Sequence, residues 1–331
     1  MAWVARWYRV SAARDQPWHL RAASRVVIGA TGILSHGIAR YAFGNGGVTI
    51  DGAERLHDAA RAAATRGGAP LITVANHHSV LDDPVVITLV SPDAVLVPRR
   101  TRWIPATREI LFASRARAWW FGPGQCVPIE RDVGYPGGLA QPGLRTVAQR
   151  LAGATGSGSR WAHVFPEGRI CQKGLGRAWD HERAAYLRWG VGKLAAWTSL
   201  ASSPLLAAPS FKPPVILPFY HMGMASALPL CRETNRSLRT LPKRGGRLRV
   251  KVGAPVAVAD LLEAFDDMAD TGGGGSGGLA GRRWEDAPTD AEKRLYAAIA
   301  RRCQEALAGL ARDCGAGELE RAHGGYDVWT D

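Results

Sequence analysis

The sequence predicts an α/β fold in which helices cover both faces of a central sheet. Two observations support this prediction. Short runs rich in β-branched and aromatic residues alternate along the chain with longer stretches of helical pattern, as in a sheet whose strands are separated by helices. The chain also has 331 residues, 46% of them hydrophobic, which is enough for one large domain or two smaller ones.

Seven short runs are expected to be strands, because each is rich in residues that favour a buried, pleated surface. They are residues 48–50, 71–75, 94–97, 127–129, 161–165, 215–219 and 248–252. Helices are expected over residues 53–65, 84–90, 139–151 and 183–198. A last helix should begin near Thr289, which has capping-box spacing to Glu292, and end near Gly315.

The chain divides into four predicted parts. Residues 1–44 form a basic, aromatic segment, and residues 45–262 form the main domain. Residues 263–288 are expected to be a Gly-rich linker, and residues 289–331 a C-terminal amphipathic helix and tail. That helix should pack back on the main domain, because apolar residues recur on one of its faces.

The N-terminal segment has an unusual composition. Its first 25 residues hold five arginines and three tryptophans against a single acidic residue. This is typical of an amphipathic helix at a membrane surface or of a targeting segment, and an ordinary helix packed on the domain is the third possibility. The longest apolar run, residues 26–38, is shorter than the roughly 20 residues that cross a bilayer. We therefore expect the protein to lie on a membrane without crossing it.

The charge of the chain points to an anionic partner. The formal net charge is +13, and the chain contains 12 tryptophans, a residue that favours membrane interfaces. No known nucleic-acid-binding module is present, so we predict an anionic membrane surface and no nucleic acid as partner. Residues 99–124 mix arginines with three tryptophans and suit the same surface, although a basic helix exposed to water is the alternative.

The five cysteines are scattered and form no C-x-x-C pair. This pattern argues against a disulfide framework and against a zinc ribbon, so we expect the cysteines to be small buried residues.

The segment NHHSVLDDP, residues 76–84, concentrates polar side chains directly after a predicted strand. In open α/β sheets, chemistry usually lies at the carboxyl ends of strands, where His77 is expected. Asp82 can accept a hydrogen bond from Nδ1–H of His77, which would fix the tautomer and leave Nε2 free as a base. Asp83 suits the N-cap of the next helix, and Pro84 suits its first turn.

Three other interpretations of this segment remain open. The histidines and aspartates could bind a metal ion, although adjacent histidines rarely share one ion and no H-x-x-x-H spacing is present. Ser79 could be a nucleophile, although its neighbours do not form a G-x-S-x-G elbow. The segment could also be a polar turn with a purely structural role.

The segment and three later blocks, taken together, resemble the glycerolipid acyltransferase family. NHHSVLDDP matches the N-H-x-S-x-x-D signature of that family. The blocks that follow in the family's order are GQCVPIERD (124–132), HVFPEGRI (163–170) and VILPFYHMG (215–223). The resemblance covers roughly residues 45–255. It implies the glycerolipid acyltransferase fold, an α/β fold with a central mixed sheet flanked by helices, and the activity of an O-acyltransferase.

One subgroup of the family is especially similar. The doubled DDP, the run YLRWGVGKL (186–194) and the run HMGMASALP (221–229) match it. The resemblance to this subgroup implies CoA-independent acyl exchange between phospholipids and lysophospholipids, which remodels cardiolipin at mitochondrial membranes, with no cofactor. Other relatives use acyl-CoA or acyl-carrier protein, so a CoA-dependent lysophospholipid acyltransferase is the alternative. A non-enzymatic lipid-binding or nucleic-acid-binding protein is a third hypothesis, based on charge and tryptophan content.

The site residues can be assigned provisional roles. His77 is the candidate general base and Asp82 its orienting acid. By resemblance, Glu167 and Gly168 hold the glycerol backbone of the acceptor, while Arg131 binds phosphate. The weaker candidates for binding phosphate are Arg169, Lys173, Arg188 and Lys193. Backbone N–H groups near Gly168 or in the loop after the first block could stabilise the oxyanion. The residues expected to support the site structurally are Asn76, Ser79, Asp83, Pro84 and Pro218.

Overall fold

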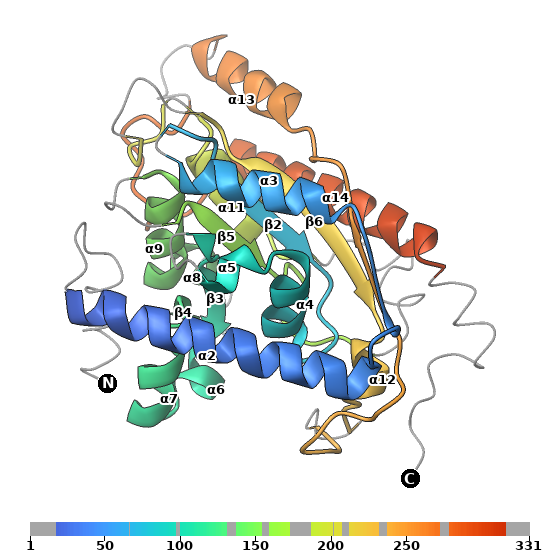
Figure 1. Ribbon diagram of the computed structural model, residues 1–331. Coiled ribbons are helices and arrows are strands. Elements are labelled where there is room, and N and C mark those ends of the chain that lie inside the picture. Colours follow the sequence, from blue (N-terminus) through green and yellow to red (C-terminus); the bar gives the residue numbers. More distant parts are fainter. Residues whose placement is uncertain are drawn as a thin grey trace.

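The computed structural model describes residues 18–65, 67–96, 100–130, 137–153, 159–172, 187–200, 202–206, 212–231, 237–271 and 278–315. Within these ranges the chain forms a mixed α/β structure, as predicted (Figure 1).

The central sheet has five strands in the order β1-β7-β6-β2-β5. The strands are β1 (Val48–Asp51), β7 (Leu248–Val252), β6 (Val215–Met222), β2 (Leu71–Ala75) and β5 (Trp161–Val164). Neighbouring strands run parallel, except that β6 and β7 are antiparallel. The predicted central mixed sheet is therefore confirmed, and the carboxyl ends of β2, β5 and β6 meet at one edge of it.

A small parallel sheet extends the main one beyond β5. It consists of β3 (Ile104–Thr107) and β4 (Cys126–Ile129). Trp103 joins the two sheets, because its N–H donates to the carbonyl of Trp161 at 2.7 Å and its carbonyl accepts from the N–H of His163 at 2.9 Å. β3 and the segment after it are thereby placed next to the end of β5.

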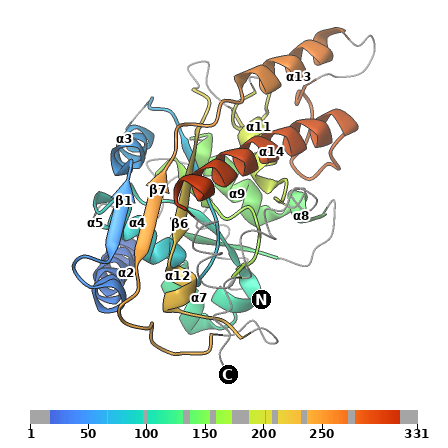
Figure 2. The same cartoon turned by 90° about the vertical axis from the view of Figure 1, so that its right-hand side faces the viewer.

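Helices cover both faces of the sheet, which is why its strands are apolar on both sides (Figure 2). On one face lie α2 (Trp18–Phe43), α3 (Ala53–Ala64), α4 (Asp82–Val90) and α5 (Asp93–Leu96). On the other lie α9 (Pro142–Leu151), α11 (Gly190–Trp197) and α14 (Asp290–Asp313). The other helices are α6 (Arg108–Leu111), α7 (Arg115–Phe121), α8 (Gly137–Ala140), α12 (Met224–Ala227) and α13 (Ala259–Thr271).

Helix α2 is longer than the apolar run in the sequence indicated. It continues over 26 residues and, by length and composition alone, is one helix that could cross a membrane. One of its faces, however, packs against α4 and α5. Gly32 allows this close approach, since a Cβ at that position would lie 2.7 Å from Cβ of Val95. The packed face of α2 is thus covered by α4 and α5.

The structure departs from the predicted elements at several positions. The strand expected over residues 94–97 is wrong, because residues 93–96 form α5. Strand β3 was not predicted, and residues 263–271 of the expected linker are helical, as the end of α13. The start of α14 is confirmed: Thr289 and Glu292 form a reciprocal capping box.

Candidate active site

The candidate site lies where the carboxyl ends of β2, β5 and β6 come together. β2 leads into Asn76 and His77, β5 leads into Phe165 and Glu167, and His221 lies near the end of β6. Parallel pairing brings the first two ends side by side, so that the backbone N–H of His77 donates to Oε1 of Glu167 at 3.1 Å. Residues from three blocks that are far apart in sequence therefore form one site.

His77 and Asp82 make the contact expected from their spacing. Nδ1 of His77 lies 3.0 Å from Oδ2 of Asp82, and no described residue bonds to Nε2. The imidazole also stacks on the ring of Phe165, with centroids 4.0 Å apart and planes 11° apart. The ring orientation is thus restrained from two sides, while 19% of the side chain stays exposed.

Asp82 is buried and strongly hydrogen-bonded. The same Oδ2 accepts from the backbone N–H groups of His78, at 2.5 Å, and Ser79, at 2.7 Å. Burial by itself raises the pKa of the Asp82 carboxyl, but the neighbouring His221 and His77 outweigh burial and hold that pKa below its usual value. The carboxylate therefore stays ionised and can stabilise a positive charge on His77.

Asn76 and His221 lock the ends of β2 and β6 together. Nδ2 of Asn76 donates to the carbonyl of His221 at 2.9 Å, and the backbone N–H of His221 donates to Oδ1 of Asn76 at 2.9 Å. Nε2 of His221 also lies 3.0 Å from the carbonyl of Asn76 and 3.6 Å from Oδ2 of Asp82. Burial lowers the pKa of His221, and it lowers the pKa of His78 to about 3. The His78 imidazole is therefore neutral at physiological pH.

Glu167 faces the site from the end of β5. Burial raises the pKa of its carboxyl to about 7, despite the hydrogen bonds that it accepts. Its Oε2 is buried without a partner among the described residues. Gly168 follows with a φ of 70°, and a Cβ there would lie 2.3 Å from Nε of Arg188. A glycine is needed at this turn for the backbone conformation and for the space that Arg188 occupies.

Asp83 is not the N-cap that the sequence predicted. Helix α4 begins at Asp82, and its N-cap is Leu81, which makes no side-chain capping hydrogen bond. Asp83 instead pairs with Arg102: Nε of Arg102 donates to Oδ1 at 2.7 Å, and a second guanidinium nitrogen donates to Oδ2. The N-cap expectation fails because a bidentate partner from just before β3 satisfies the carboxylate. The pair ties the turn after β2 to the small sheet.

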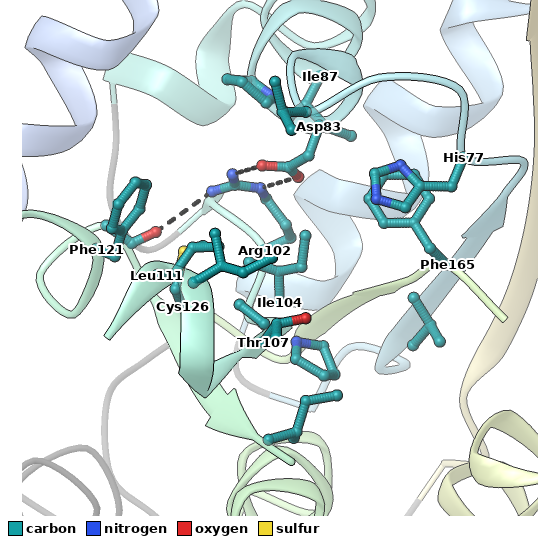
Figure 3. A pocket seen from close by; sticks show the side chains of 18 of the residues that line it. His77, Asp83, Ile87, Arg102, Ile104, Thr107, Leu111, Phe121, Cys126 and Phe165 are labelled. Carbon is teal, nitrogen blue, oxygen red and sulfur yellow. Dashed lines mark hydrogen bonds and ion pairs between the residues drawn. The ribbon is translucent and has the colours of Figure 1, made fainter. Parts of the chain in front are cut away.

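A mostly apolar pocket of about 330 Å³ opens beside His77 (Figure 3). Its walls come from α2, α4, the small sheet, α6, α7 and the turn after β5. Figure 3 shows His77 stacked on Phe165, with the Asp83–Arg102 pair beside them. Val80, Ile110 and Trp120 line the pocket and are also exposed, so the pocket reaches the surface among apolar side chains.

The cationic candidates are only partly placed. Arg131 lies outside the described residues. Arg169 and Arg188 both line the pocket. Lys193 is buried and does not line it, and Lys173 lies outside the described residues. The backbone N–H groups of residues 77, 78, 79 and 168 are all hydrogen-bonded within the chain. At these four positions, the N–H groups that the sequence suggested as donors to an oxyanion already donate hydrogen bonds within the chain.

The remaining predicted residues have structural contacts. Ser79 is buried, and its Oγ accepts from the N–H of Leu81 at 3.2 Å. Pro84 lines the pocket in the first turn of α4, and Pro218 lies in β6 opposite Val74. Within the described ranges, no three His, Cys, Asp or Glu side chains are placed to share a metal ion.

Three residues of the site escaped the sequence reasoning: Arg102, Phe165 and His221. Phe165 and His221 stood inside quoted blocks, so their position at strand ends was a usable signal. Arg102 stood in the basic segment 99–124, but nothing local indicated that it pairs with Asp83.

The comparison with protein families identifies the class. A family model described as Acyltransferase matches residues 47–221, more than half of the chain, including the first three blocks and most of the fourth. The chain therefore belongs to the acyltransferase family, as the sequence predicted.

Individual relatives support the predicted subgroup. "Taffazin" of Dictyostelium discoideum is 29% identical over 198 residues, which cover 60% of this chain and 59% of that protein. "N-acylphosphatidylethanolamine synthase" of Arabidopsis thaliana is 33% identical over 190 residues, 57% of this chain and 56% of that protein. Proteins named tafazzin in Drosophila melanogaster and Saccharomyces cerevisiae match as well. The matched part spans less than two thirds of each of these relatives.

A solved structure is also similar. The 1-acyl-sn-glycerophosphate (LPA) acyltransferase PlsC from Thermotoga maritima matches with a TM-score of 0.38 and 16% identity, covering 73% of this chain and 75% of that one. This likeness is too distant to support a conclusion about the site.

Proposed function

We propose that this protein transfers acyl chains between phospholipids and lysophospholipids, with His77 as general base. The observation that carries the proposal is the 3.0 Å contact between His77 Nδ1 and Asp82 at the edge of an apolar pocket. With Nδ1–H donating to Asp82, Nε2 is the nitrogen that can take a proton from a substrate hydroxyl.

The reaction follows from this tautomer. The hydroxyl oxygen of the lysolipid attacks the ester carbonyl carbon of the donor lipid while Nε2 of His77 takes its proton. Asp82 stabilises the imidazolium that forms. The tetrahedral intermediate then collapses, and the glycerol oxygen of the donor leaves with the proton from His77. The acyl chain has moved, a new lysolipid is released, and His77 is neutral again. No protein nucleophile is required.

The oxyanion of the intermediate needs donors near the carbonyl carbon. Since the nearest backbone N–H groups are already bonded within the chain, we assign this role to a guanidinium at the pocket, that of Arg169 or Arg188. Glu167 would accept hydrogen bonds from the glycerol backbone, and Arg131 would contact the lipid phosphate.

The pocket suits an acyl chain. It is mostly apolar, its volume of about 330 Å³ lies in the range of small-molecule sites, and His77 borders it. A chain held there would bring its ester carbonyl to the histidine. The acyl donor is proposed to be a phospholipid rather than acyl-CoA, as in tafazzin, with cardiolipin remodelling at a mitochondrial membrane as the setting.

The Arabidopsis relative supports a second candidate function. Its name denotes a product acylated on the amine of phosphatidylethanolamine, and it is 33% identical to this chain. The same histidine could take a proton from an attacking amine, so that the donor would be shared and only the acceptor would differ.

An exchange assay without CoA separates these possibilities. The purified protein is incubated with a labelled diacyl phospholipid under three parallel conditions. The added acceptor is a lysophospholipid, phosphatidylethanolamine, or a lysophospholipid together with unlabelled acyl-CoA. We expect label in the lysophospholipid product, with a fall of about 10²–10⁴-fold in His77→Gln and none in the matched variant His57→Gln on α3. Label only in an N-acylated product would favour the second candidate. Acylation that requires acyl-CoA would contradict the proposal that a phospholipid is the acyl donor. Full activity of His77→Gln would contradict the proposal that His77 is the general base.

A further inference from the structure

The large hydrophobic side chains that the described residues expose are confined to one part of the molecule. They lie in four places only, namely α2, the turn after β2, the α6–α7 region, and a loop over residues 237–247. They are Trp18, Val26, Ile33, Leu34, Tyr41, Val80, Ile110, Trp119, Trp120, Leu238 and Leu241. Helices α3, α9 and α14 contribute none to this set.

Three of these segments lie at the same end of the molecule. In Figures 1 and 2, α2, α7 and the loop that follows α12 all run along the lower edge, while α13 is at the top. Segments separated by about 200 positions in sequence thus lie in the same half of the molecule.

The loop over residues 237–247 is held in place by its backbone. The N–H of Leu238 donates to the carbonyl of Pro229 at 3.0 Å, and the N–H of Lys243 donates to that of Ala227 at 2.7 Å. Its two leucines nevertheless stay 50% and 63% exposed. A well-bonded loop that keeps two leucines in water is unusual for a surface with no partner.

The loop is also joined to α2. The guanidinium of Arg244 lies 4.4 Å from the ring centroid of Tyr41, and the N–H of Gly246 donates to the carbonyl of Ala42 at 3.0 Å. The loop therefore meets the C-terminal end of α2, where Tyr41 is exposed.

The loop is basic as well as apolar. Its sequence, SLRTLPKRGGR, contains four cations and no acidic residue. Arg239, Lys243, Arg244 and Arg247 are all exposed, and none forms an ion pair with an acid among the described residues. Leucines that can enter a hydrocarbon region, surrounded by unpaired cations, fit the interface of an anionic bilayer.

We propose that residues 237–247 bind anionic phospholipid bilayers and, together with the outer face of α2, orient the protein on the membrane. This deepens the proposed function by naming the surface through which the site meets its lipids. Val80, Ile110 and Trp120 belong to the exposed apolar set and also line the pocket. A lipid chain can accordingly pass from the docked bilayer to His77 along apolar side chains.

The charges of the loop are tested by vesicle flotation of the full-length protein. The probes are phosphatidylcholine vesicles with and without phosphatidylglycerol. The variant Arg239→Gln/Lys243→Gln is compared with Arg294→Gln/Arg301→Gln, which removes two exposed charges from α14. A cation near an anionic surface changes affinity by about fivefold, so the loop variant should lose about 25-fold on phosphatidylglycerol vesicles and the α14 variant much less.

The leucines are tested by Leu238→Gln/Leu241→Gln in the same assay. We expect at least about tenfold weaker binding to both kinds of vesicle. The thermal midpoint should be unchanged because both side chains already face water. Equal vesicle binding by the loop charge variant and the α14 charge variant would overturn the proposal. It would also be overturned if the loop charge variant lost binding to duplex DNA while its binding to vesicles was unaffected. His77→Gln should float like the wild type, so a failure of lipid exchange and a failure of docking are distinguishable.

Discussion

Two of the buried groups of ionisable side chains in the described residues can be compared, one at the carboxyl ends of β2, β5 and β6 and one between α11 and α14. The first is built around Asp82 and Glu167, and the second around Lys193 and Glu292. Both remove ionisable groups from water, and both contain groups whose pKa is displaced by burial. Only the first borders the pocket, and this difference decides which of them can act on a substrate.

The second cluster is held together by contacts among its own members, although Nε of Arg282 and Nε1 of Trp284 are buried without a partner among the described residues. Nζ of Lys193 donates to the carbonyl of Trp284 at 2.7 Å and lies 4.3 Å from the centroid of that ring. Glu292 accepts from Tyr296 at 3.0 Å and from Arg282 at 3.0 Å. Burial lowers the pKa of Lys193 to about 8 and raises that of Tyr296. The shifted pKa values of Lys193 and Tyr296 therefore occur in a cluster with a structural role, which is to hold α14 against α11.

The first cluster also contains buried polar atoms without a partner among the described residues, namely Oδ1 of Asp82, Oε2 of Glu167 and Nδ1 of His221. It differs from the second cluster because it reaches the pocket through His77. A displaced pKa is therefore a weak indicator of catalysis unless the groups also reach a cavity. The variants below compare the two clusters directly.

The largest effect is expected for Asp82→Asn. The amide keeps the shape of the side chain but cannot stabilise the imidazolium of His77, so lipid exchange should fall by about 10²–10⁴-fold. The rate of exchange per folded molecule is the measurement, with circular dichroism as the check of folding. An exchange rate within tenfold of the wild type would refute the role of the carboxylate.

The matched change in the second cluster is Glu292→Gln. It weakens the charge-assisted contact with Arg282 and should lower the free energy of unfolding by about 1–3 kcal/mol. The exchange rate per folded molecule should stay the same, because Glu292 does not line the pocket. Urea unfolding and the exchange assay together measure this, and a loss of exchange as large as that of Asp82→Asn would erase the distinction between the clusters.

Glu167→Gln should change the pH dependence of stability. A carboxyl whose folded pKa is about 7, against 4.5 unfolded, binds more protons when folded, so the wild type loses stability as pH rises from about 5 to about 7. The glutamine variant lacks this loss and should gain about 2 kcal/mol on the wild type over that interval. Thermal midpoints across the pH range measure it. A constant difference between the two proteins would mean that the carboxyl titrates normally.

The smallest effect is expected for Phe165→Leu. Leucine keeps the site apolar but removes the stacking on His77, which is worth about 0.5–1.5 kcal/mol for an aromatic pair. Exchange should fall less than tenfold, mainly in kcat, because the imidazole is less well oriented while lipid binding is retained. An effect confined to KM would assign Phe165 to substrate binding instead.

Local features of this protein were predictable from the sequence. The bounds of β2 and β7 match the expected strands, and the His77–Asp82 contact follows from a spacing of five residues in one turn. The expected strand at 94–97 failed because four apolar residues cannot distinguish a strand from a helical turn. Here the short run after Ser91 and Pro92 turns into α5.

Contacts between distant segments were not predictable in the same way. The partner of Asp83 is 19 residues away, and the partner of Asn76 is 145 residues away. Both pairings depend on which strands are neighbours and in which register, and one sequence does not reveal either. The family resemblance supplied the order of the blocks, but it did not indicate that Asp83 belongs to an ion pair.

Helix α2 supplies Val27, Ile28 and Thr31 to the wall of the pocket, although it precedes the segment that matches the family. A shortened chain beginning at residue 45 would keep His77 and Asp82 but would open that wall to solvent. Water would then compete with the lipid acceptor for the activated ester. We expect such a fragment to release free fatty acid, because the wall formed by α2 would no longer favour transfer of the acyl chain over its hydrolysis.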